Sequence, residues 1–189
     1  MMNRMWIGAA VMILFLAGSV CAAPDRSGKW DAGMKVSGAF SDDKDLDEAV
    51  FVEGSTSYGI NEWLAIGAEL GWQERELSNQ DLTAVPILAD VIVRVPQEPD
   101  MQLQPYGIVG VGAIVWDYDD SRDAAPEFDT ESSFATKIGG GVDYFLTDQW
   151  ILNTEVAYIY TNEDVNVTDI SRNVDLDYWT AGVGVKHVF

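Results

Sequence analysis

Residues 178–189, YWTAGVGVKHVF, decide the fold because they alternate in character up to the last residue. One face carries Ala181, Val183, Val185, His187 and Phe189, and the other carries Thr180, Gly182, Gly184 and Lys186. A period of two indicates a β-strand with two different faces. Most soluble domains instead let their termini fray into poorly ordered segments. The pattern therefore predicts a terminal strand that must pair with another strand of the chain.

Seven earlier segments alternate in the same way. With the last one they predict eight strands at about residues 29–40, 49–60, 63–74, 82–95, 103–116, 132–146, 149–161 and 173–189. Short connections (61–62, 96–102 and 147–148) alternate with mostly longer acidic ones (41–48, 75–81, 117–131 and 162–172). An up-and-down sheet places these two kinds of connection at opposite ends. The sequence thus predicts an all-β, eight-stranded antiparallel up-and-down barrel. Closely spaced glycines leave the facing of residues 103–116 open.

The N-terminus has the layout of a secretory signal peptide. Arg4 precedes an apolar run, and small residues follow at 19–23. This layout predicts cleavage after Ala22, so that residues 1–22 are a signal peptide and residues 23–189 form one domain. The alternatives are an uncleaved membrane-spanning segment and a lipoprotein acylated at Cys21, the only cysteine. Cleavage after Ala22 would leave the domain without a thiol.

The composition excludes several classes of protein. The chain of 189 residues has a formal net charge of −20 and one histidine. Such acidity disfavours nucleic acid, which requires a basic face. A hydrophobic fraction of 48% argues against a disordered acidic chain.

Three features favour a transmembrane barrel over a soluble barrel such as a lipocalin, whose G-x-W opening matches Gly28-Lys29-Trp30. The predicted strands exceed the roughly 9–11 residues that cross a bilayer at a tilt. Glycines crowd the polar face, as suits a narrow lumen. Aromatic residues gather near both strand ends, as in the two interfacial girdles of membrane barrels. The loop-end band includes Phe40, Trp72, Trp116 and Trp179.

The chain resembles the small OmpA/OmpX/OmpW-type outer-membrane barrels of Gram-negative bacteria. The stretches that carry the resemblance are residues 58–67 (YGINEWLAIG), 105–112 (PYGIVGVG), 139–150 (GGGVDYFLTDQW) and 184–189 (GVKHVF). The resemblance implies a porin-like cell-envelope protein, monomeric, with outer-membrane lipid, lipopolysaccharide and the barrel assembly machinery as partners. It also implies that Gly184, His187 and Phe189 belong to the assembly signal, although His187 replaces the usual aromatic or large apolar residue.

Charged residues on the polar faces predict a filled lumen. Lys35, Glu53, Glu69, Lys137 and Glu155 should lie at similar heights and form one cluster. A salt-bridged filling is the first interpretation, because buried charges need partners. A gate or proton path is the second. An eight-stranded barrel is too narrow for a wide pore.

No catalytic residue, metal site or cofactor is predicted. Some eight-stranded barrels modify lipid A with a serine and a histidine, but His187 is expected at the periplasmic rim, away from Ser37, Ser55 and Ser57. The loop at Asp43, Asp45 and Asp47 begins like a calcium loop but lacks its glycine and closing glutamate.

The sequence thus predicts a non-enzymatic outer-membrane barrel with a structural or surface-interaction role, through acidic extracellular loops that contact a ligand. A narrow channel for small or lipophilic solutes is the alternative, followed by a lipid A-modifying enzyme and a soluble lipocalin-like periplasmic barrel.

Overall fold

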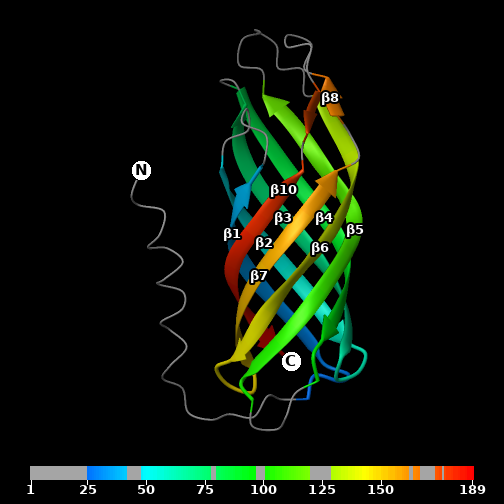
Figure 1. Cartoon of the computed structure of the whole chain (residues 1–189), viewed down its shortest axis with the longest axis vertical. Coiled ribbons are helices and arrows are strands. Elements are labelled where there is room, and N and C mark those ends of the chain that lie inside the picture. Colours follow the sequence, from blue (N-terminus) through cyan, green and yellow to red (C-terminus); the bar gives the residue numbers. More distant parts are fainter. Residues whose placement is uncertain are drawn as a thin grey trace, which may run out of the picture.

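Eight long strands close into one antiparallel barrel in the computed structural model, which describes residues 25–41, 48–77, 80–96, 101–119, 129–161, 164–166, 173–175 and 177–189. The strands are β1 (Trp30–Phe40), β2 (Ala49–Gly59), β3 (Leu64–Leu77), β4 (Gln80–Arg94), β5 (Leu103–Asp119), β6 (Asp129–Phe145), β7 (Trp150–Thr161) and β10 (Tyr178–Val188), with a separate hairpin of β8 (Asp164–Asn166) and β9 (Asn173–Asp175). Figure 1 shows the tilted barrel strands and the hairpin above one rim. No helix in these ranges is long and apolar enough to cross a membrane.

The last strand pairs with the first. β10 and β1 are antiparallel neighbours from Asp31 opposite Val188 to Phe40 opposite Trp179. The amide of Phe189 donates to the carbonyl of Trp30 at 2.9 Å, so the ladder continues into the final residue. The predicted closed barrel of eight antiparallel strands is confirmed, and the terminal strand is part of that closure.

Several strand ends differ from the prediction at the loop end of the barrel. β3 and β4 continue to Leu77 opposite Gln80, so most of the expected connection 75–81 is strand. β5 and β6 likewise extend to Asp119 and Asp129. The expected strand 173–189 is divided, because residues 173–175 pair with β8 instead. Acidic residues in these segments favoured loops in the prediction. A hairpin that projects past a membrane can face water on both sides, which accommodates charge in a strand.

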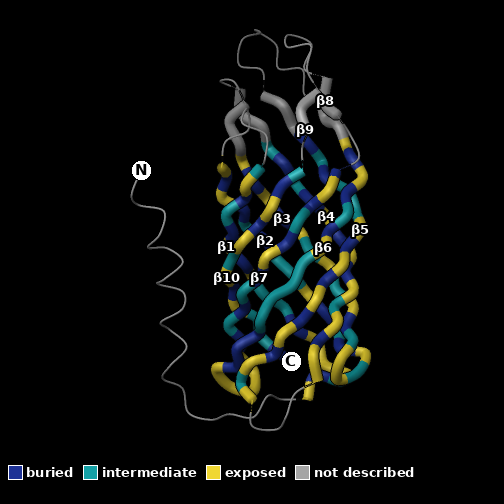
Figure 2. Tube along the Cα trace, in the orientation of Figure 1, coloured by how far each residue is buried: buried dark blue, intermediate teal, exposed yellow. Residues whose placement is uncertain are grey.

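The facing of the strands is that of a membrane barrel. Met34 is 68% exposed whereas its neighbour Lys35 is 7% exposed. Exposed and buried positions alternate around the wall in Figure 2, with large apolar side chains on the outside. A soluble barrel would have the opposite arrangement. On β5, Gln104, Tyr106 and Ile108 face the lumen. Trp116 is 1% exposed and also faces inward, so its assignment to an outer girdle was wrong.

The short turns at the other end are built by side-chain acceptors. The Asn61 Oδ1 accepts from the amides of Trp63 and Leu64 at 3.0 and 2.8 Å. The Thr147 hydroxyl accepts from the amides of Gln149 and Trp150 at 3.2 and 3.0 Å. Asn and Thr side chains supply such local bonds in turns. In barrels of this architecture the short-turn end is periplasmic and the loop end is extracellular.

Candidate functional site in the barrel lumen

Two lysines hold three glutamates together in the middle of the lumen. The Lys35 Nζ lies 2.8 Å from the Glu53 Oε2 and 2.5 Å from the Glu155 Oε1. The Lys137 Nζ lies 2.6 Å from the Glu69 Oε2 and 2.8 Å from the Glu155 Oε1. These are the five residues that the sequence placed in one cluster, and the structure brings all of them together. We call them the central layer.

The central layer follows from strand register. Lys35 and Glu53 are direct partners on β1 and β2. Lys137 is on β6 and Glu69 on β3, which are not adjacent in the barrel, so their contact crosses the lumen. The side chain of Lys137 is fully buried. Removing such charges from water is costly unless each has a close partner, and here each of the five has at least one.

A second ionic layer, the periplasmic layer, lies nearer the short-turn end and consists of Arg26, Asp31, Arg94, Asp143 and Lys186. The Arg26 guanidinium contacts the Asp31 Oδ2 at 2.5 Å and the Asp143 Oδ2 at 2.6 Å. Lys186 approaches Asp143 at 3.3 Å, and Arg94 approaches Asp31 at 3.4 Å. Burial disfavours the charged guanidinium, but the carboxylates of Asp143 and Asp31 outweigh it and raise the pKa of Arg26. The sequence prediction did not include Arg26 among the lumen residues.

A tight turn before β1 places Arg26 inside the barrel. The Lys29 amide donates to the Arg26 carbonyl at 3.2 Å, and Gly28 has a φ of 70°. Glycine adopts this left-handed conformation without steric cost. The Gly28 amide also donates to the Gly59 carbonyl at 2.8 Å, which ties the turn to β2. Arg26 precedes the first strand and so lay outside the alternating pattern from which lumen residues were predicted.

Tyr106 and Asn153 connect the two layers. The Tyr106 hydroxyl donates to the Glu155 Oε2 at 2.7 Å. The Asn153 Nδ2 donates to the Tyr106 hydroxyl at 2.9 Å and to the Asp143 Oδ1 at 2.8 Å. The polar network is therefore continuous from the central layer to the periplasmic layer. Sequence reasoning missed both residues. Asn153 could have been predicted, because it lies two residues before Glu155 on β7 and therefore on the same face of the strand. Tyr106 could not, because it lies on the strand whose facing the sequence left open.

Little free space remains between these side chains. A cavity of about 20 Å³ is lined by residues of both layers, among them Lys35, Glu69, Asp90 and Glu155. A cavity needs roughly 10–15 Å³ to hold one water molecule. This cavity therefore has room for a water molecule.

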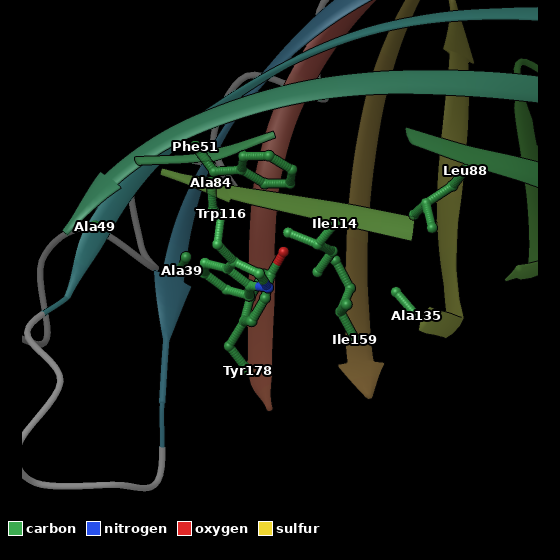
Figure 3. Close-up of a cluster of buried hydrophobic side chains, with 10 residues drawn as sticks. All are labelled: Ala39, Ala49, Phe51, Ala84, Leu88, Ile114, Trp116, Ala135, Ile159 and Tyr178. Atoms are coloured by element: carbon green, nitrogen blue, oxygen red, sulfur yellow. The ribbon is translucent and has the colours of Figure 1, made fainter. Parts of the chain in front are cut away.

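The lumen changes character toward the loop end. Ten buried apolar residues pack together there: Ala39, Ala49, Phe51, Ala84, Leu88, Ile114, Trp116, Ala135, Ile159 and Tyr178. Figure 3 shows these side chains converging from several strands, and we call them the apolar layer. Its one indole nitrogen is satisfied, since Trp116 donates to the Ser133 hydroxyl at 2.8 Å. The prediction of a polar lumen did not include this layer.

The backbone pairing of β3 with β4 lacks two residue pairs beside the apolar layer. Between β3 and β4 the pairing stops after Leu70 opposite Ile87 and resumes at Gln73 opposite Ala84, in the same register. The interruption contains Pro86, whose nitrogen has no hydrogen to donate. The pairings of the other barrel strands are continuous within the described residues. A Cβ atom on Gly71 would collide with the rings of Phe51 and Pro86, so Phe51 lies against the inner side of this interruption.

The C-terminal residues of the predicted assembly signal lie on both faces of β10. The His187 ring has its centre 4.7 Å from those of Trp150 and Phe189 at the short-turn rim. Gly184 faces the lumen opposite Lys35. The Ser37 and Ser57 hydroxyls are bonded to Glu53 and Asp31, so the structure keeps them apart from His187.

Some predicted features lie outside the described residues. They are the signal peptide 1–22, the carboxylates at 43–47 and most of the acidic segment 117–123. Within the described ranges, no three His, Cys, Asp or Glu residues are grouped so that they could hold a metal ion.

A closed barrel with an apolar exterior and a charged lumen is an integral membrane β-barrel. The chain belongs to the outer membrane protein beta-barrel domain family, whose model matches residues 9–187. It is therefore a protein of the Gram-negative outer membrane.

Known proteins and structures support the same assignment. Outer membrane protein AlkL of Ectopseudomonas oleovorans is 32% identical over 92 residues, which are 47% of this chain and 40% of AlkL, so the match spans less than half of that relative. Neisserial surface protein A has the same fold with a TM-score of 0.68 at 18% identity, over 86% of this chain and 98% of its own. OprG from Pseudomonas aeruginosa gives 0.58 at 15% identity, over 89% and 99%.

Proposed function

We propose that this barrel conducts no ions and transfers small lipophilic molecules from the extracellular side into the outer membrane. The observation that carries the proposal is the gap in the β3–β4 backbone pairing at Pro86, beside an apolar layer. The function also accounts for the lumen, which is apolar at the loop end and ionic below. An apolar molecule that entered from outside would be stopped by the ionic layers, since burial of their charges depends on the pairing that it would disrupt.

A molecule in the apolar layer would leave the barrel laterally, between β3 and β4, and enter the membrane. Leu70 and Trp72 face the membrane on β3 at the interruption, with exposed fractions typical of the lipid-facing wall. Phe51 faces inward at the same place and packs edge-on against Tyr178, with ring centres 6.4 Å apart. Rotation of the Phe51 ring away from Gly71, together with local separation of β3 and β4 at the unpaired residues, would join the apolar layer to the membrane. We therefore assign Phe51 as the gate residue of this route.

The lateral route can be tested by restoring the backbone hydrogen-bond donor that Pro86 lacks. Pro86→Ala supplies an amide hydrogen, which should allow β3 and β4 to pair continuously. Gram-negative cells that express the variant should take up a small lipophilic fluorophore more slowly than wild-type cells, close to cells without the barrel. Pro105→Ala is the matched control, because Pro105 lies on β5 within a continuous pairing near the short-turn end. Uptake by wild-type cells no faster than by cells without the barrel would contradict the proposal, and so would equal uptake by wild-type and Pro86→Ala cells at matched amounts of folded protein.

A reversible disulfide bond between β3 and β4 provides a second test of the lateral route. Trp72→Cys and Val85→Cys face each other across the interruption in the β3–β4 register. Oxidation of this pair should abolish uptake, and reduction should restore it in the same cells. If the geometry does not allow this disulfide, the two thiols will remain free after oxidation. The comparison of Pro86→Ala with the wild type does not depend on that result. Equal uptake in the oxidised and reduced states would exclude an exit between β3 and β4.

The central and periplasmic layers together should block ion flow through the lumen, and we call this barrier the ionic seal. Conductance measurements test it. Because the central and periplasmic layers leave room for a single water molecule, purified wild-type protein in planar bilayers should show negligible conductance. Reproducible single-channel steps that change in Lys35→Met would show an aqueous pore through the lumen and would favour a channel for small polar solutes instead.

A surface role through the loops is the second candidate. Of 31 acidic and 11 basic residues in the chain, six and five belong to the lumen filling within the described residues. Most of the other acidic residues fall in the sequence segments 41–48, 75–81, 117–131 and 162–172. The proposed partner is a cationic ligand or divalent ions that bridge to lipopolysaccharide phosphates. Replacing Asp43, Asp45 and Asp47 by Asn should weaken Mg²⁺ binding measured by calorimetry. Unchanged binding would remove this loop from the proposal.

We further propose that the protein has no enzymatic activity, that residues 1–22 are removed on export, and that the C-terminal strand engages the assembly machinery. The first rests on the separation of His187 from the lumen serines. Lipid A from cells that express the wild-type barrel should be identical to lipid A from cells without it, and a modification that appears with the wild type and is lost in His187→Ala would contradict the first proposal.

A further inference from the structure

Asp90 differs from the other acidic residues of the described lumen, because its carboxylate has no partner. It lies on β4, faces inward, and is 4% exposed. Neither of its carboxylate oxygens has a hydrogen-bond partner. The other acidic side chains of the two layers, Asp31, Glu53, Glu69, Asp143 and Glu155, each have an ion pair. Buried polar groups without a partner are rare in native proteins, so this one requires an explanation.

The surroundings of Asp90 offer no free cation. Its strand neighbours are Gly67 on β3 and Gly110 on β5, and its Oδ1 occupies the space that a Cβ on Gly110 would fill. The charged groups that act on it are Glu69 on β3, Lys137 on β6, Glu155 on β7 and Lys35 on β1. Each lysine already contacts two glutamates. A charged Asp90 would therefore face Glu69 without a counter-ion of its own.

A count of the charged groups in the lumen also leaves Asp90 without a counter-ion. Its described part contains five basic side chains, Arg26, Lys35, Arg94, Lys137 and Lys186. It contains six acidic ones, the five paired residues and Asp90. The excess is one negative charge. An unpaired charge inside a protein is costly, and a carboxyl group commonly avoids this cost by taking up a proton.

We propose that Asp90 is a proton-binding site, occupied at mildly acidic pH, and that this bound proton balances the charge of the lumen filling. The carboxyl group lines the cavity of about 20 Å³, which has room for one water molecule to accept its O–H. Loss of the proton as the pH rises through neutral places an uncompensated carboxylate beside the paired Glu69. The filling then has to admit water or lose stability, so the ionic seal is sensitive to alkaline pH. This inference concerns the seal and does not depend on transfer of lipophilic molecules.

The expected pH dependence has a definite sign. Between mildly acidic and neutral pH the folded barrel holds a proton on Asp90 that the unfolded chain releases, because an unperturbed Asp titrates near pH 3.9. Stability falls with rising pH where the folded state binds more protons. The folding equilibrium constant of the wild type should thus fall by up to about tenfold per pH unit until Asp90 ionises.

Asp90→Asn replaces the neutral acid by a neutral amide of the same shape. Unfolding by urea in lipid vesicles, followed from mildly acidic to alkaline pH, should show this fall in the wild type and a reduced dependence in Asp90→Asn. Asn153→Ala is the matched control: it removes hydrogen bonds to Tyr106 and Asp143 without changing the charge count of the lumen, so it should lower stability and leave the Asp90 dependence in place. Identical pH dependence in the wild type and Asp90→Asn would overturn the proposal.

Two further measurements keep the test decisive. Infrared spectra of wild-type protein with isotope-labelled aspartate should contain the carbonyl band of a protonated carboxyl group at mildly acidic pH. Its absence would overturn the proposal even if Asp90→Asn failed to fold. Replacing choline chloride by sodium chloride should leave wild-type stability unchanged. A stabilisation by sodium that is lost in Asp90→Asn would show that a metal cation, rather than a proton, balances this site.

Discussion

The Lys137 Nζ lies 2.6 Å from the Glu69 Oε2 and joins β6 to β3 across the lumen. These strands do not pair in the barrel, so this contact braces opposite parts of the wall independently of the backbone ladder. The same ammonium contacts Glu155 on β7 at 2.8 Å. The central layer therefore acts as a cross-brace and as a barrier at one height of the barrel.

Replacement of the bracing lysine should be costly. Lys137→Met removes the partner that Glu69 has in the central layer and leaves Glu155 with Lys35 alone. Breaking a buried ion pair by removing one side typically costs about 3–5 kcal/mol. We expect a loss of this size in the free energy of unfolding, measured with urea in lipid vesicles.

The partner substitution provides the control. Glu69→Gln in the Lys137→Met background removes the orphaned charge and should restore part of the lost stability. If the double variant is as unstable as the sum of the two single variants, the pair has no coupling energy and the brace interpretation is wrong.

The turn at Arg26 should act as a weaker lock on the periplasmic end. Arg26→Met removes two ion pairs, but Asp31 retains Arg94 and Asp143 retains Lys186. We expect a loss of about 1.5–3 kcal/mol, the usual range for hydrogen bonds to charged groups. Amide hydrogen exchange should speed up at Gly28 and Gly59, which bond the turn to β2. Unchanged exchange there would mean that the turn is held without Arg26.

The lipid-facing wall can be tested by placing charge at two depths. Val36 is 53% exposed near the middle of β1, and Val95 is 52% exposed at the short-turn end. Val36→Arg should cost about 2–4 kcal/mol, and Val95→Arg about 0–1 kcal/mol, because the cost of charge falls toward the interface. Equal costs at the two positions would place the membrane differently along the barrel.

Deletion of Phe189 should impair assembly more than stability. Its amide continues the ladder to Trp30 and its ring contacts His187, so the finished barrel loses one hydrogen bond and one ring contact. A net loss of about 1–2 kcal/mol is expected on refolding in vitro. In cells the variant should accumulate unassembled in the periplasm, as cell fractionation and heat-modifiable gel mobility would reveal. Normal assembly in cells would show that Phe189 is dispensable for targeting.

The sequence alone determined the strand number, the closure and the identity of the central layer. These follow from a period of two, since side chains on a strand alternate strictly between faces. Lys35, Glu53 and Glu155 share the inward parity of their strands, and their heights can be counted from the short turns. A local pattern is enough where the fold is a regular hairpin barrel.

Only the tertiary structure decided the rest. Arg26 enters the lumen from a turn outside any strand, and Tyr106 lies on a strand in which glycines hide the parity. The apolar layer forms because Phe51, Trp116 and Tyr178 meet at one height from distant parts of the chain. Asp90 shares its parity with the paired acids, yet both lysines within reach are already occupied. Which charges find partners depends on distances across the lumen, and a one-dimensional pattern contains no such distances.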